Sequence, residues 1–206
     1  MIEHGPLLER LLAGDFICEI SDSDGFRHLN NEQTQLAINH YLRPLNRRIV
    51  SNDERSVYFL AYHELTPDAR EHLSSQFALT VQSLLPVLEW LQLIQETLGR
   101  DSALTAGDTI KLQEFVLRTE DNQSLRQRLN TLATDRFFNS QSEALDQQVK
   151  LIFRRLKEHG YLRQPHGDRQ YYIVTGKIDY LLDIIRFIRD EEHLPVDDAP
   201  AQESLI

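Results

Sequence analysis

The sequence predicts a mainly helical α+β protein in which two small units, each with a β-hairpin, are joined by one long helix. Three observations predict this class. Apolar side chains recur at intervals of three and four residues over most of the chain, which is typical of amphipathic helices. Two pairs of short β-favouring runs each surround a polar turn. One apolar stripe, from Leu73 to Leu98, is much longer than any other.

The first 65 residues are predicted to contain short elements with clear boundaries. Gly14 follows a first helix, Asn30 or Asn31 can cap a later one, and Pro44 ends it. The expected elements are a helix over 5–13, a strand over 16–20, a turn over 21–25, a helix over 32–43, and a hairpin with strands over 47–50 and 56–60.

A long helix is predicted to follow, beginning at Thr66 and Pro67 and ending at Gly99. Pro86 lacks a backbone donor, so we expect a kink there or two abutting helices. The apolar stripe of this helix has two interpretations that stay open. It packs in a core, or it contributes to a subunit interface, because a helix of about 30 residues presents more apolar surface than two small units can cover.

The remainder of the chain repeats the pattern of the first part. The residues Ser140 to Glu143 form a capping-box motif that is expected to open a helix ending at Gly160. The expected elements are helices over 108–118, 122–133 and 140–159, a hairpin with strands over 161–163 and 169–174, and a helix over 176–190. The acidic residues from 194 onward, which include two prolines, are predicted to be disordered.

Three small helices followed by a hairpin are the elements of a winged helix, in which the hairpin is the wing. The fold class is therefore mainly α with small β-hairpin wings, arranged as tandem winged-helix domains joined by a long helix. The predicted domains are an N-terminal winged helix over 1–65, a connecting helix over 66–100, a C-terminal winged helix over 101–193 and an acidic tail over 194–206.

Composition restricts the class of partner. The chain has 206 residues with a formal net charge of −10, whereas a protein that binds nucleic acid with its whole surface is usually basic. Any contact with nucleic acid must therefore come from a local patch or from a partner. No signal peptide is recognisable, and no apolar run approaches the roughly 20 residues that span a bilayer. Cys18 is the single cysteine, which excludes an internal disulfide and favours the cytoplasm.

Motifs of catalysis are missing. The sequence has no Gly-rich phosphate loop and no nucleophile elbow, and His63-Glu64 lacks the second histidine of a zinc helix. We expect Cys18 to be a buried, inert thiol, because no nearby cation would lower its pKa. The sequence therefore predicts no catalytic, cofactor-binding or metal-binding residue, and a small hydrolase or metalloenzyme is disfavoured.

One basic cluster stands out against the acidic background. Lys150, Arg154 and Lys157 are spaced four and three apart, so they share a helical face that differs from the apolar one. Two interpretations stay open: a solvated face, or contact with the nucleic-acid backbone by the helix that would enter a major groove. The candidate DNA-binding residues are Lys150, Arg154, Arg155, Lys157, Arg163 and Arg169. A smaller cluster of Arg43, Arg47, Arg48 and Arg55 is more typical of a solvated surface.

Several segments resemble the MukE/MksE-type accessory subunits of bacterial condensins, called kite proteins, and are nearer to the MksE group. No single motif is diagnostic, and the order of elements over roughly 5–190 carries the resemblance. The segments are LLAGDFIC (11–18) and YFLAY (58–62) in the first half, and LTAGDTI (104–110), DQQV (146–149) and RRLKEHGYL (154–162) in the second.

The resemblance implies a non-enzymatic subunit that forms a homodimer and binds an MksF-like kleisin, and through it an MksB-like SMC-type ATPase. It implies a nucleoid-associated role in the cytoplasm, in chromosome segregation or plasmid defence. Weak, nonspecific binding of double-stranded DNA remains an expectation from the basic cluster, whereas a membrane, a cofactor and a small-molecule substrate are not expected. The alternative is a dimeric winged-helix transcriptional regulator that binds operator DNA.

Overall fold

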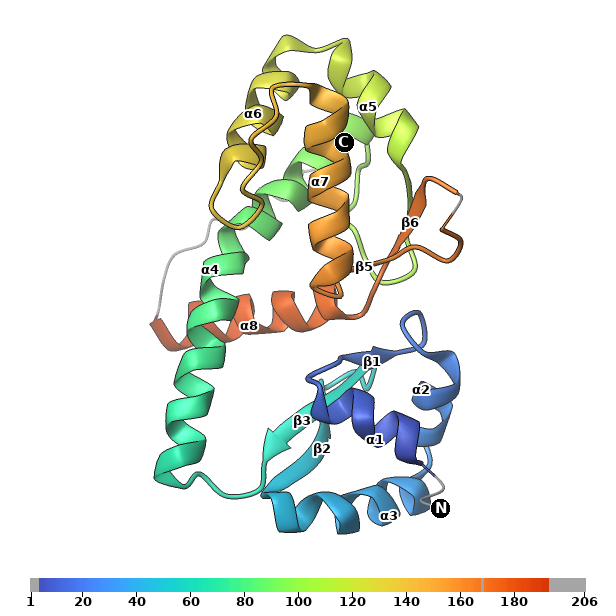
Figure 1. The fold of residues 1–206 in the computed structure, drawn as a ribbon, viewed down its shortest axis with the longest axis vertical. Helices are drawn as coiled ribbons and strands as arrows, with labels where there is room; N and C mark the ends of the chain where they lie inside the picture. Colours follow the sequence, from blue (N-terminus) through green and yellow to red (C-terminus); the bar gives the residue numbers. More distant parts are fainter. Residues whose placement is uncertain (1–3, 168, 193–206) are drawn as a thin grey trace, which may run out of the picture.

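Two groups of helices and strands lie toward opposite ends of a long helix, and the last helix lies between them (Figure 1). The computed structural model describes residues 4–167 and 169–192, so the predicted disordered tail lies outside the described residues. The elements are α1 Gly5–Leu12, β1 Ile17–Cys18, α2 Ser23–Leu29, α3 Glu32–Leu42, the 3-10 turn η1 Arg43–Leu45, β2 Arg47–Ser51, β3 Val57–Tyr62, α4 Pro67–Leu98, β4 Thr109–Lys111, α5 Leu112–Glu120, α6 Gln123–Thr134, α7 Leu145–Glu158, β5 Leu162–Arg163, β6 Tyr171–Val174 and α8 Lys177–Glu192.

The N-terminal half, residues 4–65, packs α1, α2 and α3 against a small antiparallel sheet. Its strand order is β1-β3-β2, with Ile17 opposite Tyr58 and Ile49 opposite Leu60. Apolar side chains from all three helices and all three strands form one core. The buried members of this core are Leu7, Leu8, Leu11, Ile17, Leu29, Ile38, Leu42, Ile49 and Tyr58.

The C-terminal half, residues 101–192, has a sheet of the same form. Its order is β4-β6-β5, so the last strand is again the central one. The core of this half is larger and includes the C-terminal part of α4, where Trp90 is fully buried and packs edge-on against Phe153 of α7. The long helix is therefore a connector only over its N-terminal part.

Helix boundaries that rest on capping residues are confirmed. The Asn31 side chain accepts a hydrogen bond from Thr34 N at 3.1 Å at the start of α3, and the Thr66 hydroxyl accepts one from Ala69 N at 3.3 Å at the start of α4. Gly99 ends α4 in the left-handed conformation, with φ of 61°. These caps satisfy backbone groups that a helix end leaves unpaired.

Two predictions in short segments are wrong. The segment 21–25, predicted as a turn, starts helix α2, because the Asp22 carboxylate accepts a hydrogen bond from Gly25 N at 2.9 Å and caps it. The first residues of the segment 108–118, predicted as a helix, form strand β4, in which Ile110 pairs with Tyr172. Helix α5 starts only at Leu112. Strand β4 makes the sheet of the C-terminal half three-stranded, whereas the third strand of the N-terminal half, β1, lies within the strand predicted over 16–20.

Two helix predictions in the middle of the chain also need correction. The capping box over 140–143 does not open a helix: α7 begins at Leu145, and the Ser140 hydroxyl instead accepts a hydrogen bond from Ser142 N at 3.3 Å within the preceding loop. The alternative of two abutting helices at Pro86 is wrong as well, because α4 is one continuous helix from Pro67 to Leu98.

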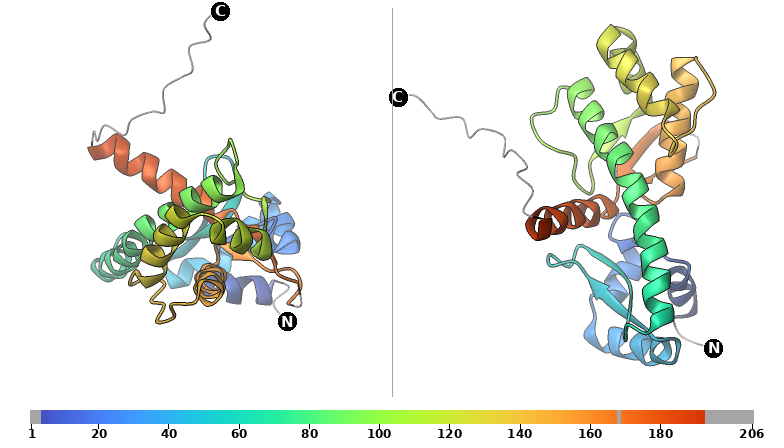
Figure 2. Two further views of the ribbon diagram at one scale, coloured as in Figure 1. Left: turned by 90° about the horizontal axis from the view of Figure 1, so that it is seen from above. Right: turned by 90° about the vertical axis from the view of Figure 1, so that its left-hand side faces the viewer.

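The two halves meet at the first turns of α8, which runs across the direction of α4 (Figure 2). Gly176 N donates a hydrogen bond to the Cys18 thiol at 3.3 Å, and the Tyr180 ring packs against Phe16 and Phe59 with ring centroids 4.7 and 4.8 Å apart. A side chain at Gly176 would meet the Cys18 Cβ at 3.0 Å. Cys18 is buried, as predicted, but by the junction between the halves rather than by a core.

Candidate nucleic-acid and partner interfaces

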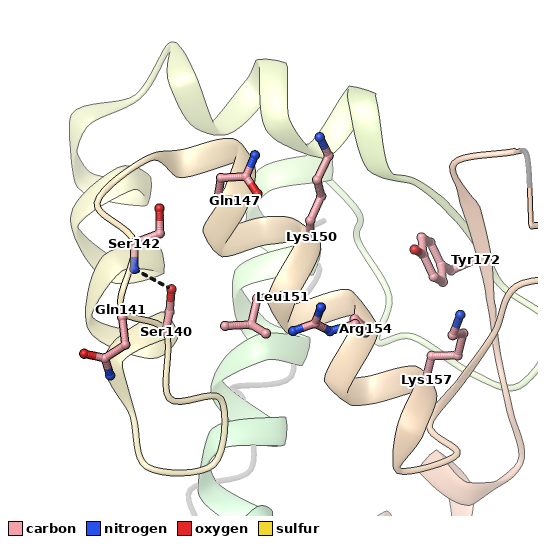
Figure 3. Close-up of a pocket in the computed structure, with 9 residues that line it drawn as sticks. All are labelled: Ser140, Gln141, Ser142, Gln147, Lys150, Leu151, Arg154, Lys157 and Tyr172. Atoms are coloured by element: carbon pink, nitrogen blue, oxygen red, sulfur yellow. Dashed lines mark hydrogen bonds between the residues drawn. The ribbon is translucent and has the colours of Figure 1, made fainter.

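An open groove of about 810 Å³ follows one face of α7 (Figure 3). Its wall on one side is the loop before α7, and on the other side the strand β6. Lys150, Arg154 and Lys157 project from successive turns of the helix along this groove. The lining residues are Ser140, Gln141, Ser142, Gln147, Lys150, Leu151, Arg154, Lys157 and Tyr172.

The charge of this α7 groove distinguishes it from other hollows of the described surface. Its lining contains three cations and no carboxylate. Four other surface hollows each contain at least one carboxylate, from Glu32, Glu89 or Glu114 in three of them and from an acidic cluster in the fourth. A groove with one sign of charge concentrates ligands of the opposite sign.

The three cations of the groove are only partly neutralised by neighbours on their own helix. Lys150 Nζ lies 2.7 Å from Asp146, and Arg154 Nε lies 3.8 Å from Glu158. Lys157 Nζ donates to the side-chain oxygen of Gln164 at 3.2 Å. Exposed pairs at these spacings contribute little energy, so a phosphate or carboxylate can replace them at small cost.

The structure does not bring the other three candidate residues into the groove. Arg155 is half-buried on another side of α7, where its guanidinium lies 3.1 Å from Glu158 and its Nε has no hydrogen-bond partner. Arg163 donates to the backbone oxygen of Ile20 and so links β5 to the N-terminal half. Arg169 is exposed just before β6 but does not line the groove. The loop residues Ser140 to Ser142 also line the groove but have no signal in the sequence, because their place follows from the tertiary fold.

Charge at the C-terminal end of α7 is set by burial. Burial lowers the pKa of His159, and the nearby positive charge of Lys177 lowers it further, so the imidazole is mainly neutral at pH 7. His159 does not line the groove, whose positive charge comes from Lys150, Arg154 and Lys157. Within the ranges that the structure describes, no group of three or more metal-binding side chains occurs.

The N-terminal part of α4 presents a second surface. Residues 70–79 are all exposed, and the large apolar side chains exposed here are Leu73, Phe77, Leu79, Val81 and Leu85. The core-packing interpretation of the stripe thus holds for the C-terminal part of α4, whereas this apolar face is left open to a partner.

The same helix meets one criterion of a membrane span. An 18-residue window of α4 has a mean hydropathy of 1.4, which by length and composition is enough to cross a membrane, and 33% of the window is buried. A single helix of this kind is weak support for a membrane span, because the core helix of a soluble protein meets the same criterion.

An open basic groove and an uncovered apolar helix are both features of proteins that bind macromolecules. The sequence model of a protein family, described as "Condensin complex protein MksE", matches residues 3–186. The chain belongs to this MksE family. No curated protein matches the chain. Membership implies a non-catalytic subunit of a condensin-like, multi-subunit complex.

Proposed function

We propose that the protein is the accessory subunit that binds the kleisin of a bacterial SMC–kleisin complex, and through the MksF-like kleisin reaches an MksB-like ATPase. The match to the condensin family over residues 3–186 carries this proposal. The complex acts at the nucleoid in the cytoplasm, in chromosome organisation and segregation or in plasmid defence.

Each half of the chain is a winged helix, a proposal supported by the three-stranded sheets and by the helices packed on them.

Co-purification tests the kleisin proposal directly. The protein, expressed together with an MksF-like kleisin from the same genome, is expected to co-elute with that kleisin in size-exclusion chromatography. The ATPase is expected to join the assembly only when the kleisin is present. Failure to bind the kleisin, with the protein folded by circular dichroism, would contradict the proposal.

We also propose that the protein is a homodimer whose interface draws on the N-terminal half and the exposed apolar face of α4. Leu73 and Phe77 are 38% and 51% exposed, so Leu73→Asp with Phe77→Asp removes apolar contact without creating a cavity in a core. Light scattering is expected to give twice the chain mass for the natural protein and the single chain mass for the variant. A monomeric natural protein at tens of micromolar contradicts the dimer.

The α7 groove is proposed to bind duplex DNA weakly and without sequence preference, through phosphates alone. Three cations in the groove suggest about three phosphate contacts, so the logarithm of affinity should fall with the logarithm of salt with a slope of about −3. Nonspecific affinity is expected at the weak end of the range of about 10⁻⁴–10⁻⁶ M.

The DNA proposal is tested by polarisation over a salt series. Arg154→Glu with Lys157→Glu is expected to abolish binding, whereas Lys111→Glu with Arg126→Glu, an equal charge change at exposed positions outside the groove, should weaken it only slightly. Equal loss in both variants would assign the effect to net charge. Nanomolar binding to one short palindrome would instead support the transcriptional regulator.

A further inference from the structure

We propose that the acidic segment 193–206 of this chain occupies the α7 groove and competes there with nucleic acid. The inference rests on the proposed DNA contact for its consequence, but the contact itself can be measured without DNA. The proposal is based on the positive charge of the groove and on the negative charge of the sequence that follows α8.

The negative charge of the chain is concentrated at one end of the sequence. The residues 190–206 contain six carboxylates and no lysine or arginine, so they carry six of the ten net negative charges. Three of these carboxylates, Asp197, Asp198 and Glu203, lie in the segment 193–206. The segment 193–206 therefore contributes three of the ten net negative charges, and residues 190–192 contribute three more.

The groove is complementary to this segment in charge and in chemistry. It presents three cations without a carboxylate, beside the apolar surface of Leu151 and Tyr172. The segment places the adjacent carboxylates Asp197 and Asp198, and then Glu203, among small and apolar residues, and Pro195 and Pro200 favour an extended backbone that can lie along an open groove. Tyr172 belongs to β6 and Lys150 to α7, so one ligand can contact both walls.

The length of the segment is sufficient. The last described helix ends at Glu192, and Glu203, the last carboxylate of the segment, can lie up to about 36–40 Å from it along an extended chain. A folded chain of about 200 residues has a radius of gyration of about 17 Å, so this reach is comparable to the size of the protein.

Tethering makes even a weak contact effective. A segment joined by a short flexible linker has an effective concentration in the millimolar range. If the contact has a dissociation constant near 0.1 mM, the segment then occupies the groove for most of the time. DNA that contacts the groove through a few phosphates can still displace the segment. The segment thus raises the apparent dissociation constant for DNA and does not prevent DNA binding.

The contact is tested with a labelled peptide of residues 193–206 and the chain truncated after Glu192. We expect salt-sensitive binding by fluorescence anisotropy that is lost with Arg154→Glu and Lys157→Glu and kept with Lys111→Glu and Arg126→Glu. A peptide in which Asp197, Asp198 and Glu203 become Asn, Asn and Gln should not bind. Absence of binding by the natural peptide at millimolar concentration overturns the proposal.

Competition is tested on the full chain. Truncation after Glu192, or the triple change Asp197→Asn, Asp198→Asn and Glu203→Gln, is expected to tighten DNA binding about 3- to 10-fold at low salt. Replacement of 193–206 by an uncharged Gly/Ser segment of equal length should do the same. Equal DNA affinity of all forms overturns competition. If no form binds DNA, the proposed DNA contact fails, while the peptide titration still decides the contact between segment and groove.

Discussion

The helix that precedes the β-hairpin has a different exposed surface in each half of the protein. In the N-terminal half, α3 contains no lysine or arginine, and its Leu36 and Tyr41 are exposed. In the C-terminal half, α7 carries four cations, three of which line its groove. Both helices bury apolar residues against a three-stranded sheet of the same order. The comparison indicates that similar buried faces maintain the fold of both halves, while the exposed faces differ in charge and so favour different ligands.

The largest expected effect tests whether the two cores are independent. Leu156 on α7 and Leu42 on α3 are both fully buried, in different cores. Truncation of either to alanine is expected to lower the free energy of unfolding by about 2–5 kcal/mol. Hydrogen exchange should accelerate mainly in the half that carries the change. A loss under about 0.5 kcal/mol in denaturant titration would mean that the helix faces are assigned wrongly.

The junction between the halves is expected to be the next most sensitive place. Gly176→Val forces a side chain against Cys18 Cβ and the backbone oxygen of Ser56, at 3.0 and 3.4 Å from the added Cβ. Overpacking of this kind costs about 1–3 kcal/mol. Because Cys18 is 1% exposed, its reaction with maleimide should become faster as the halves separate. Gly167→Ala, which meets nothing within 4 Å, is the matched control, and equal labelling in both variants would contradict a junction at Gly176.

Charge substitutions can test whether the exposed faces of α3 and α7 have different binding roles. Leu36→Asp with Tyr41→Asp on α3 is expected to weaken self-association at least tenfold, about 1.4 kcal/mol, because it places charge in a proposed apolar interface. The same variant should leave DNA binding nearly unchanged, whereas Arg154→Glu with Lys157→Glu should do the opposite. Analytical ultracentrifugation and polarisation measure both properties, and loss of both in one variant would contradict the division between the faces.

A smaller effect is expected from Lys177 at the start of α8. Burial lowers its pKa to about 8 from 10.5, and its ammonium group lies 4.8 Å from the Phe16 ring and 4.9 Å from the Tyr161 ring. Between these two pKa values the unfolded chain binds the extra proton, so the contribution of Lys177 to stability rises from about pH 8 to pH 10.5. At pH 7 the lysine is charged in both states, and the cost of its burial is fully present.

Comparison with Lys177→Met isolates this contribution. The two pKa values set a limit of about 3 kcal/mol on the change between pH 7.5 and 10.5. Because Lys177 is only partly buried and solvent screens its charge, the free energy of unfolding of the natural protein, relative to the variant, is expected to increase by about 1–2 kcal/mol. Urea titrations at intervals across this range measure it. A constant difference would mean that Lys177 keeps an ordinary pKa in the folded protein.

Elements with strong local signals were predictable from the sequence. The caps at Asn31 and Thr66 determined where α3 and α4 begin, and Gly99 determined where α4 ends. The spacing of Lys150, Arg154 and Lys157 predicted their common face, since a helix places residues three and four apart on one side. Helix α2 was missed because an Asp–Ser–Asp–Gly composition suits both a turn and a helix start.

The sequence by itself determined the helical class, the repeated order of elements and the basic face of α7, because caps and periodicity act over a few residues. Only the tertiary structure decided which surfaces are free. Strands β1 and β4 have two and three residues and exist by pairing with β3 and β6, far away in the sequence. Arg163 contacts Ile20 rather than a ligand, and the α4 stripe is divided into a buried and an exposed part. Each of these outcomes depends on contacts between distant segments, which short-range patterns do not specify.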